Sequence, residues 1–183
     1  MLDSRLKYFV LTGTPGTGKT TLIEFLRAHG QHVQTETARE VLAEQKAIDG
    51  PGLPSKSPLR FVQMMLERAI SKFENSQTLG GPVFFDRGIP DLIAYAERFG
   101  VDASEFQQAS ESYRYSKTVF VLSPWKEIFV NDSERLLTYE ASLLFHESLL
   151  AAYRRLGYEL IEVPFGTLAE RADFVRAIVS RGR

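Results

Sequence analysis

Residues 13–20 read Gly-Thr-Pro-Gly-Thr-Gly-Lys-Thr, and this stretch decides the fold of the chain. It fits the pattern Gly-x-x-x-x-Gly-Lys-Ser/Thr (Walker A), a loop whose backbone amides surround phosphate oxygens. The apolar run before it, residues 8–11, is typical of a buried parallel strand. Residues 21–27 after it place Leu22, Ile23 and Leu26 on one face of a helix. Strand, glycine-rich loop and helix in this order predict a nucleotide-binding P-loop.

The chemistry of the loop follows from the charge of a nucleoside triphosphate. Glycines let the backbone N–H groups approach phosphate oxygens, and the helix N-terminus adds partial positive charge. Lys19 is suited to the β- and γ-phosphates, and the Thr20 hydroxyl is suited to magnesium. ATP and Mg²⁺ are therefore the expected cofactors. The expected nucleotide-binding residues are Gly13, Thr14, Pro15, Gly16, Thr17, Gly18, Lys19, Thr20 and Thr21.

Composition limits the classes of protein to which the chain can belong. With 183 residues, 44% of them hydrophobic and 25% charged, it is expected to form one domain over residues 1–183 with a small lid. The net charge of −1 and the lack of a basic stripe signal no nucleic-acid partner. The absence of cysteine excludes disulfides and thiolate zinc sites. No apolar run approaches the ~20 residues of a membrane span, and no signal peptide is recognised, so a cytoplasmic protein is expected. The oligomeric state is not indicated.

The rest of the chain alternates between strand-like and helix-like segments. The expected strands are residues 8–11, 31–35, 82–86, 118–122 and 158–163. The expected helices are residues 21–27, 36–42, 59–73, 92–99 and 138–156, with two more beginning at capping-box patterns at 102–105 and 167–170. This alternation predicts a three-layer α/β fold with a five-stranded parallel sheet and right-handed crossovers. The breaker-rich loop at 49–55 is equally consistent with substrate contacts and with a plain connector.

Polar side chains follow several of these strands, and ligands of such sheets bind at the carboxyl ends of strands. Asp86 ends an apolar strand, as the acidic residue of a Walker B strand does, so it is expected either to help hold magnesium or to act as a base. Arg87 is open to two roles, contact with phosphate or pairing with an acid at the edge of the sheet. Glu36 and Arg39 are three residues apart on one helical face, which suits either an acceptor site or a plain surface ion pair.

The chain resembles a family of P-loop ATPases and kinases that is loosely headed "AAA domain". This family is related to the ribosylnicotinamide kinase domain of the bacterial NAD regulator. The resemblance covers nearly the whole chain and implies a core like that of nucleoside and nucleotide kinases, with strand order 2-3-1-4-5. It is carried by the P-loop at 11–21, Glu-Thr-Ala-Arg-Glu at 36–40, Asp-Arg-Gly-Ile-Pro-Asp at 86–91, Trp-Lys at 125–126, Asp-Ser-Glu-Arg at 132–135 and Leu-Gly-Tyr at 156–158. It does not name the substrate. Oligomeric AAA+ motors carry Asp-Glu where this chain has Asp86-Arg87, so a ring-forming motor is not expected.

The resemblance also implies roles for the candidate site residues. Glu36 falls where related nucleoside kinases place an acidic base, and Arg39 would hold the acceptor. The charged segment 124–137 is interpreted as a lid, in which Arg135 would stabilise transition-state charge as an arginine finger does; the alternative is a solvated charged segment. The expected function is transfer of the γ-phosphoryl group of ATP to a small hydroxylated, nucleoside-like metabolite. The alternative is a nucleotide-dependent switch that controls a partner protein.

Overall fold

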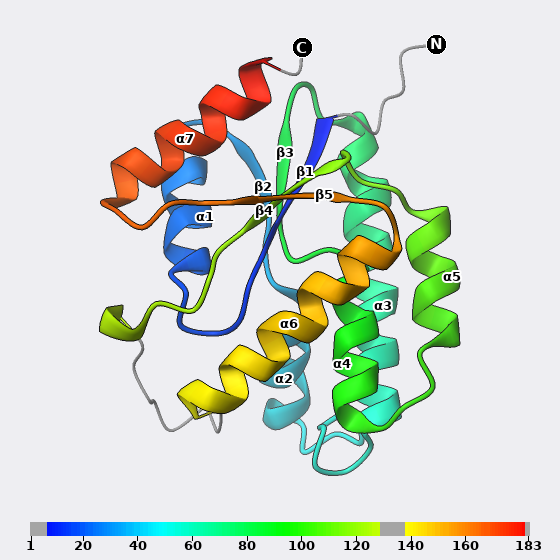
Figure 1. Ribbon diagram of the computed structural model, residues 1–183. Helices are drawn as coiled ribbons and strands as arrows, with labels where there is room; N and C mark the ends of the chain where they lie inside the picture. The colour runs from blue at the N-terminus through cyan, green and yellow to red at the C-terminus, as the bar shows by residue number, and fades with distance from the viewer. Residues whose placement is uncertain (1–6, 129–137, 182–183) are drawn as a thin grey trace.

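The computed structural model describes residues 7–128 and 138–181, which form a parallel sheet between two layers of helices (Figure 1). The strand order β2-β3-β1-β4-β5 confirms the predicted order, and every neighbouring pair is parallel. The register places Leu11 opposite Asp86 on one side of β1 and Thr12 opposite Val121 on the other. The strands are β1 (Tyr8–Thr12), β2 (His32–Gln34), β3 (Val83–Asp86), β4 (Thr118–Val121) and β5 (Glu159–Glu162).

Helices cover both faces of this sheet, as the sequence predicts. The helices α1 and α7 lie on one face, and α2 to α6 lie on the other face or extend beyond the carboxyl ends of the strands (Figure 1). The helices are α1 (Lys19–Ala28), α2 (Thr37–Ala47), α3 (Pro58–Asn75), α4 (Asp91–Phe99), α5 (Ser104–Ser112), α6 (Tyr139–Arg155) and α7 (Leu168–Arg181). Two short 3₁₀ turns cover Ser76–Thr78 and Lys126–Ile128.

Alternation along the central strand explains the two cores. Tyr8 and Val10 pack against the layer that contains α3, whereas Phe9 and Leu11 pack against α1 and α7. All five residues of β1 are buried, as expected for a strand that is covered on both faces. The strand that directly precedes the P-loop is therefore packed against helices on both faces of the sheet.

The ends of the helices follow from local hydrogen bonding. Thr138 caps α6, its side chain accepting a hydrogen bond from the Ala141 N–H, and Gly157 with φ of 77° follows the end of that helix. The predicted capping box forms before α7. The Thr167 hydroxyl accepts a hydrogen bond from the backbone N–H of Glu170, and the backbone N–H of Thr167 donates to the Glu170 carboxylate.

The pattern at 102–105 folds differently. Asp102 accepts hydrogen bonds from the backbone N–H and the hydroxyl of Ser104, and α5 begins at that serine. An aspartate can make this tighter turn, so the expected reciprocal box with Glu105 is not formed.

The breaker-rich loop at 49–55 packs closely on its neighbours. The backbone N–H of Gly52 donates to the Gln45 side chain over 2.9 Å, and a Cβ on Gly52 would lie 2.4 Å from the Met64 sulfur. Pro54 reaches a large cavity at the carboxyl end of the sheet.

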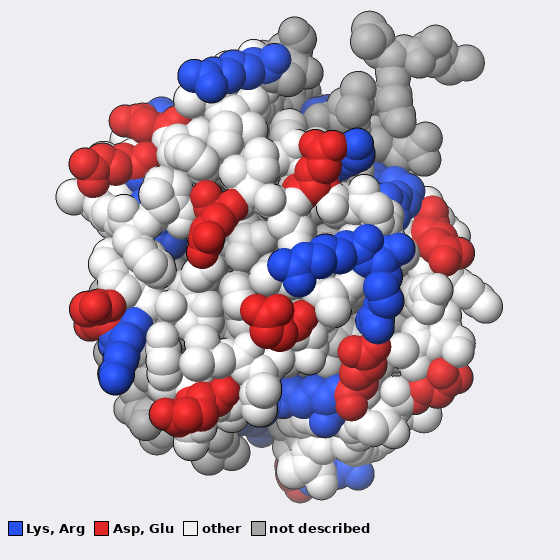
Figure 2. Space-filling model, viewed as in Figure 1, with Lys and Arg blue, Asp and Glu red and all other residues white. Residues whose placement is uncertain are grey.

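The surface carries charges of both signs. On the face shown in Figure 2, lysine and arginine side chains lie among aspartates and glutamates rather than gathering in one area. Among the described helices, none combines the length and apolar character that crossing a membrane requires.

Candidate functional site

The P-loop connects β1 to α1 in a backbone conformation that depends on glycine. Gly16 and Gly18 have φ of 88° and 78°, in the left-handed region that favours this residue. A Cβ at Gly13 would lie 2.2 Å from the carbonyl oxygen of Leu122, which follows β4. The loop is therefore folded tightly against the neighbouring strand, and its amides precede the first turn of α1, where an anion is favoured.

Lys19, Thr20 and Asp86 meet at the carboxyl ends of β1 and β3. The Lys19 Nζ lies 3.5 Å from the Asp86 Oδ1, and the Thr20 hydroxyl donates to the Asp86 Oδ2 over 3.4 Å. Both Lys19 and Asp86 are buried. Burial raises the pKa of the Asp86 carboxyl, and the charge of Lys19 opposes this increase.

These groups fit a magnesium ion held together with nucleotide phosphates. The Asp86 Oδ1 is buried and accepts no hydrogen bond from the described residues. A hydroxyl and a carboxylate oxygen side by side are the hard oxygen ligands that Mg²⁺ takes in phosphate-binding sites. Within the described part of the chain, no cluster of three or more His, Cys, Asp or Glu residues forms an all-protein metal site. Any magnesium here would therefore depend on phosphate oxygens as well as on Thr20 and Asp86.

Arg87 joins Glu36 to Asp91 beside the P-loop. Its Nε donates to the Glu36 Oε1 over 2.7 Å, and its NH1 donates to the Asp91 Oδ1 over 3.2 Å. The side chain is buried, and its backbone has φ of 71°, a conformation that costs energy for any residue other than glycine. Of the two roles open to Arg87, the structure shows pairing with acids.

Glu36 stands at the N-cap of α2, two residues after the end of β2, and it lines the same cavity as Lys19. Burial would raise its pKa. The charges of Arg87 and Lys19 outweigh burial and lower the pKa to about 2. Glu36 is therefore held as a carboxylate at neutral pH. Arg39 lies 3.9 Å from the second Glu36 oxygen, has 60% of its side chain exposed and lines the same cavity, which is compatible with either interpretation of this pair.

Asp91 ends the motif at 86–91, and the sequence assigns it no role, yet it has more hydrogen-bond partners than the other described carboxylates of the site. It is fully buried at the start of α4 and accepts hydrogen bonds from the Thr12 hydroxyl over 2.6 Å and from the Gly88 N–H over 2.9 Å. It also accepts from the Tyr153 hydroxyl of α6. This carboxylate thus joins the end of β1, the loop after β3 and α6, and it positions Arg87.

A cavity of about 860 Å³ opens at the carboxyl ends of the strands and brings most of the predicted residues together. It extends from the P-loop to the distal halves of α2 and α4. Its lining residues are Pro15, Gly16, Gly18, Lys19, Thr20, Thr21, Glu36, Ala38, Arg39, Leu42, Ala43, Lys46, Pro54, Phe61, Tyr95, Arg98, Phe99, Phe145, Leu168 and Arg171.

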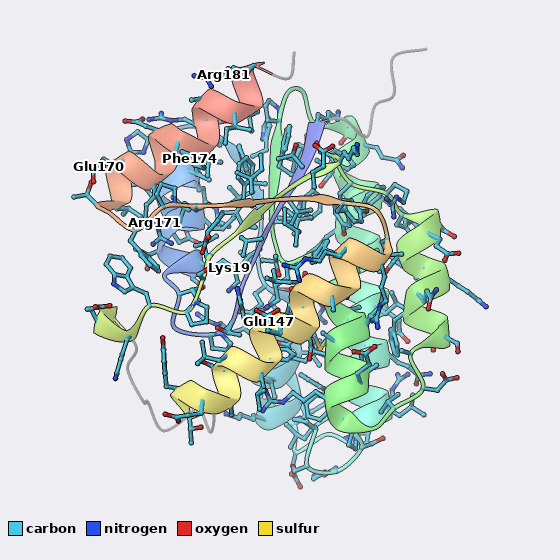
Figure 3. All side chains as sticks on the ribbon, viewed as in Figure 1. Lys19, Glu147, Glu170, Arg171, Phe174 and Arg181 are labelled. Carbon is cyan, nitrogen blue, oxygen red and sulfur yellow. The ribbon has the colours of Figure 1, made fainter. Side chains whose placement is uncertain are left out.

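Arg171 supports the P-loop from α7, a role that sequence reasoning missed. Its NH2 donates to the Thr17 carbonyl oxygen over 3.1 Å, and its guanidinium lies 6.0 Å from the centroid of the Trp125 ring. The Trp125 and Phe165 rings are in contact, with centroids 4.9 Å apart. Figure 3 labels Lys19 and Arg171, which come from the first turns of α1 and α7. In the sequence, Arg171 directly follows a capping box and carries no other distinguishing signal.

The predicted lid is described only in part. Trp125 and the turn Lys126–Ile128 follow β4, and Lys126 is exposed. Arg135, the candidate arginine finger, lies outside the described residues together with the rest of segment 129–137.

Comparison with known proteins assigns the family. A family model described as "AAA domain" matches residues 8–171. The chain belongs to this family. The comparison with curated proteins found no match for this chain.

Solved structures show that this chain has the fold of nucleoside kinases. The NadR protein in complex with NR is 19% identical with a TM-score of 0.71, and the match covers 96% of this chain and 50% of NadR. This chain therefore spans about half the length of that protein. The deoxyadenosine kinase from M. mycoides with bound dATP is 15% identical with a TM-score of 0.62, and the match covers 95% of this chain and 99% of the kinase.

Proposed function

We propose that this protein binds magnesium–ATP at its P-loop and transfers the γ-phosphoryl group to a small hydroxylated, nucleoside-like acceptor. One observation carries the proposal: Lys19 of the P-loop and Glu36, the candidate acceptor residue, line the same cavity. A volume of about 860 Å³ is within the range that holds small-molecule ligands. The fold shared with nucleoside kinases supports the same type of reaction.

The residues divide into groups that hold the nucleotide and groups that hold the acceptor. Residues 13–21 would surround the phosphates, with Lys19 neutralising the β- and γ-phosphates. Thr20 and Asp86 would hold the magnesium ion, whose charge stabilises the phosphate oxygens. Arg39 would hold the acceptor, and Arg87 would position Glu36, with which it is ion-paired.

Glu36 would accept a hydrogen bond from the acceptor hydroxyl and so orient its oxygen towards phosphorus. The oxygen–phosphorus bond forms while the bond between the γ-phosphorus and the bridging oxygen breaks, and ADP leaves with that electron pair. The hydroxyl proton passes to Glu36 and then to water. A carboxylate with a pKa of about 2 is a weak base, but the transition state of phosphoryl transfer is loose, so orientation matters more than proton removal. Arg135, from the lid segment 124–137, would add positive charge over the transferring group.

The test is a screen of hydroxylated acceptors with γ-labelled ATP, followed by the substitution Glu36→Gln. This change keeps the shape of the side chain but removes its charge and replaces one acceptor oxygen with an N–H donor, so ATP affinity should persist while transfer falls by more than about tenfold. Glu44→Gln is the matched control, since Glu44 lies on the same helix, pairs with Arg68 and does not line the cavity. Full transfer by Glu36→Gln would move the base role to Asp86. If no acceptor is phosphorylated and a protein partner binds only the ATP-bound state, the switch is the better description.

A further inference from the structure

Arg171 is a buried arginine that pairs with no carboxylate among the described residues. Only 5% of the residue is exposed, and its buried Nε has no hydrogen-bond partner in the described part of the chain. Its NH2 donates to the Thr17 carbonyl oxygen, and its guanidinium lies 6.0 Å from the centroid of the Trp125 ring. Burial lowers the pKa of Arg171, and no charge of the described residues opposes this shift. A carbonyl oxygen and a ring leave the positive charge without a negative counterpart.

The acidic residue next to Arg171 is directed elsewhere. Glu170 is exposed, and its carboxylate accepts hydrogen bonds from the backbone N–H and the hydroxyl of Thr167 at the start of α7. Figure 3 shows Glu170 at the outer edge of α7 and Arg171 on the side towards Lys19. Because Arg171 lies in the first turn of α7, the partial positive charge of that helix end adds to its own charge.

The other buried cations of the described residues are paired. The Lys19 Nζ lies 3.5 Å from the Asp86 Oδ1, and Arg87 forms ion pairs with two carboxylates. Desolvating a charge is unfavourable unless an opposite charge compensates it. Arg171 therefore differs from Lys19 and Arg87 in needing an anion that the described residues do not supply.

The position of Arg171 indicates where such an anion would bind. Arg171 and Lys19 line the same cavity, and Pro15 and Gly16 of the P-loop line it as well. The hydrogen bond to Thr17 fixes the guanidinium beside a loop that is suited to phosphate. Two unit charges about 10 Å apart near a protein surface interact strongly enough to change an equilibrium constant by roughly tenfold. A cation beside the loop can therefore strengthen phosphate binding without touching a phosphate oxygen.

We propose that Arg171 is a nucleotide-binding residue whose positive charge is compensated by the phosphates of the nucleotide in the P-loop. Magnesium–ATP keeps a net negative charge, so it can compensate Arg171 as well as Lys19. This inference rests on the nucleotide-binding part of the proposed function and does not depend on phosphoryl transfer. It gives α7 a part in binding beyond the support that the hydrogen bond to Thr17 provides to the loop.

The test separates the charge of Arg171 from its hydrogen bond. Arg171→Gln removes the charge but keeps an N–H donor, whereas Arg171→Lys keeps the charge without the planar guanidinium. The probes are magnesium–AMP-PNP, measured by calorimetry, and inorganic triphosphate with magnesium, measured by competition with AMP-PNP. Arg171→Gln should weaken the binding of both probes by about tenfold, and Arg171→Lys should keep most of the wild-type affinity. Arg176→Gln is the matched control, since Arg176 lies on the same helix, pairs with Asp173 and does not line the cavity.

Circular dichroism would first show that the variants are folded. The inference is wrong if Arg171→Gln binds both probes as tightly as wild type, or if only AMP-PNP binds more weakly, which would place the arginine at the nucleoside. It is also wrong if Arg171→Lys loses as much affinity as Arg171→Gln, since shape rather than charge would then matter.

The wild type distinguishes this inference from the proposed function. If inorganic triphosphate does not compete with AMP-PNP, phosphate charge does not carry the binding and the inference fails. If AMP-PNP does not bind at all, both the inference and the proposed function fail. The expected effects of Arg171→Gln and Arg171→Lys on binding, without transfer to any acceptor, would contradict the proposed function and leave the inference standing.

Discussion

The substitution Asp91→Ala should destabilise the protein severely although Asp91 is assigned no contact with substrate. It removes the acceptor shared by Thr12, Gly88 and Tyr153, and it leaves the buried Arg87 with Glu36 as its remaining carboxylate partner among the described ion pairs. Removing one partner of a buried ion pair typically costs about 3–5 kcal/mol. For a chain of this length, that loss corresponds to a melting temperature lower by roughly 6–20 °C.

Urea unfolding followed by far-ultraviolet circular dichroism at neutral pH would measure the free energy of unfolding. Asp173→Ala is the matched control, because Asp173 is exposed on α7 and pairs only across the helix surface with Arg176. Its loss should stay below about 0.5 kcal/mol. A loss for Asp91→Ala of less than about 1 kcal/mol would refute the conclusion that this carboxylate organises the site.

Three further outcomes are expected. Lys19→Ala should leave the protein folded but weaken magnesium–ATP binding, and unchanged affinity in calorimetry would contradict the P-loop assignment. Asp86→Asn should raise the magnesium concentration needed for half-maximal transfer, so an unaltered metal titration would limit Asp86 to a structural role. The pKa of Glu36 is lowered from 4.5 to about 2, so its charge should stabilise the fold fully above about pH 4.5 and lose this effect as the pH falls towards 2. The difference in unfolding free energy between wild type and Glu36→Gln should accordingly shrink between about pH 6 and pH 3, and a constant or growing difference would exclude this linkage.

The sequence predicts the strands of the sheet and the phosphate-binding loop at residues 13–21 because both depend on local patterns. The P-loop needs glycines at fixed spacing, and buried parallel strands read as continuous apolar runs, so residues 8–20 define β1 and the loop without reference to distant residues. The convergence of Glu36 and Asp86 on the P-loop follows from the rule that parallel strands end at one edge. The strand order required the family resemblance, since no local pattern orders the strands.

The contacts of the charged side chains could not be predicted in the same way. Asp91 receives hydrogen bonds from residues 79 positions before it and 62 positions after it, and such partners leave no local spacing in the sequence. The sequence leaves two roles open for Arg87 because its ion pair with Glu36 joins residues that are 51 positions apart. Arg171 carried no signal, since an arginine in the first turn of a surface helix is ordinary until its contact with Thr17 is known.

The hydrogen bond between Arg171 and Thr17 has a consequence for biosynthesis. The two residues are 154 positions apart, so at ribosomal rates the loop emerges roughly 8–30 s before the arginine that supports it. During this interval the nascent chain already carries the complete phosphate-binding signature but lacks α7. A ribosome-bound chain arrested before residue 168 should therefore bind nucleotide weakly, and addition of α7 should complete the binding site. Nucleotide present during translation would then stabilise only chains that have nearly finished folding.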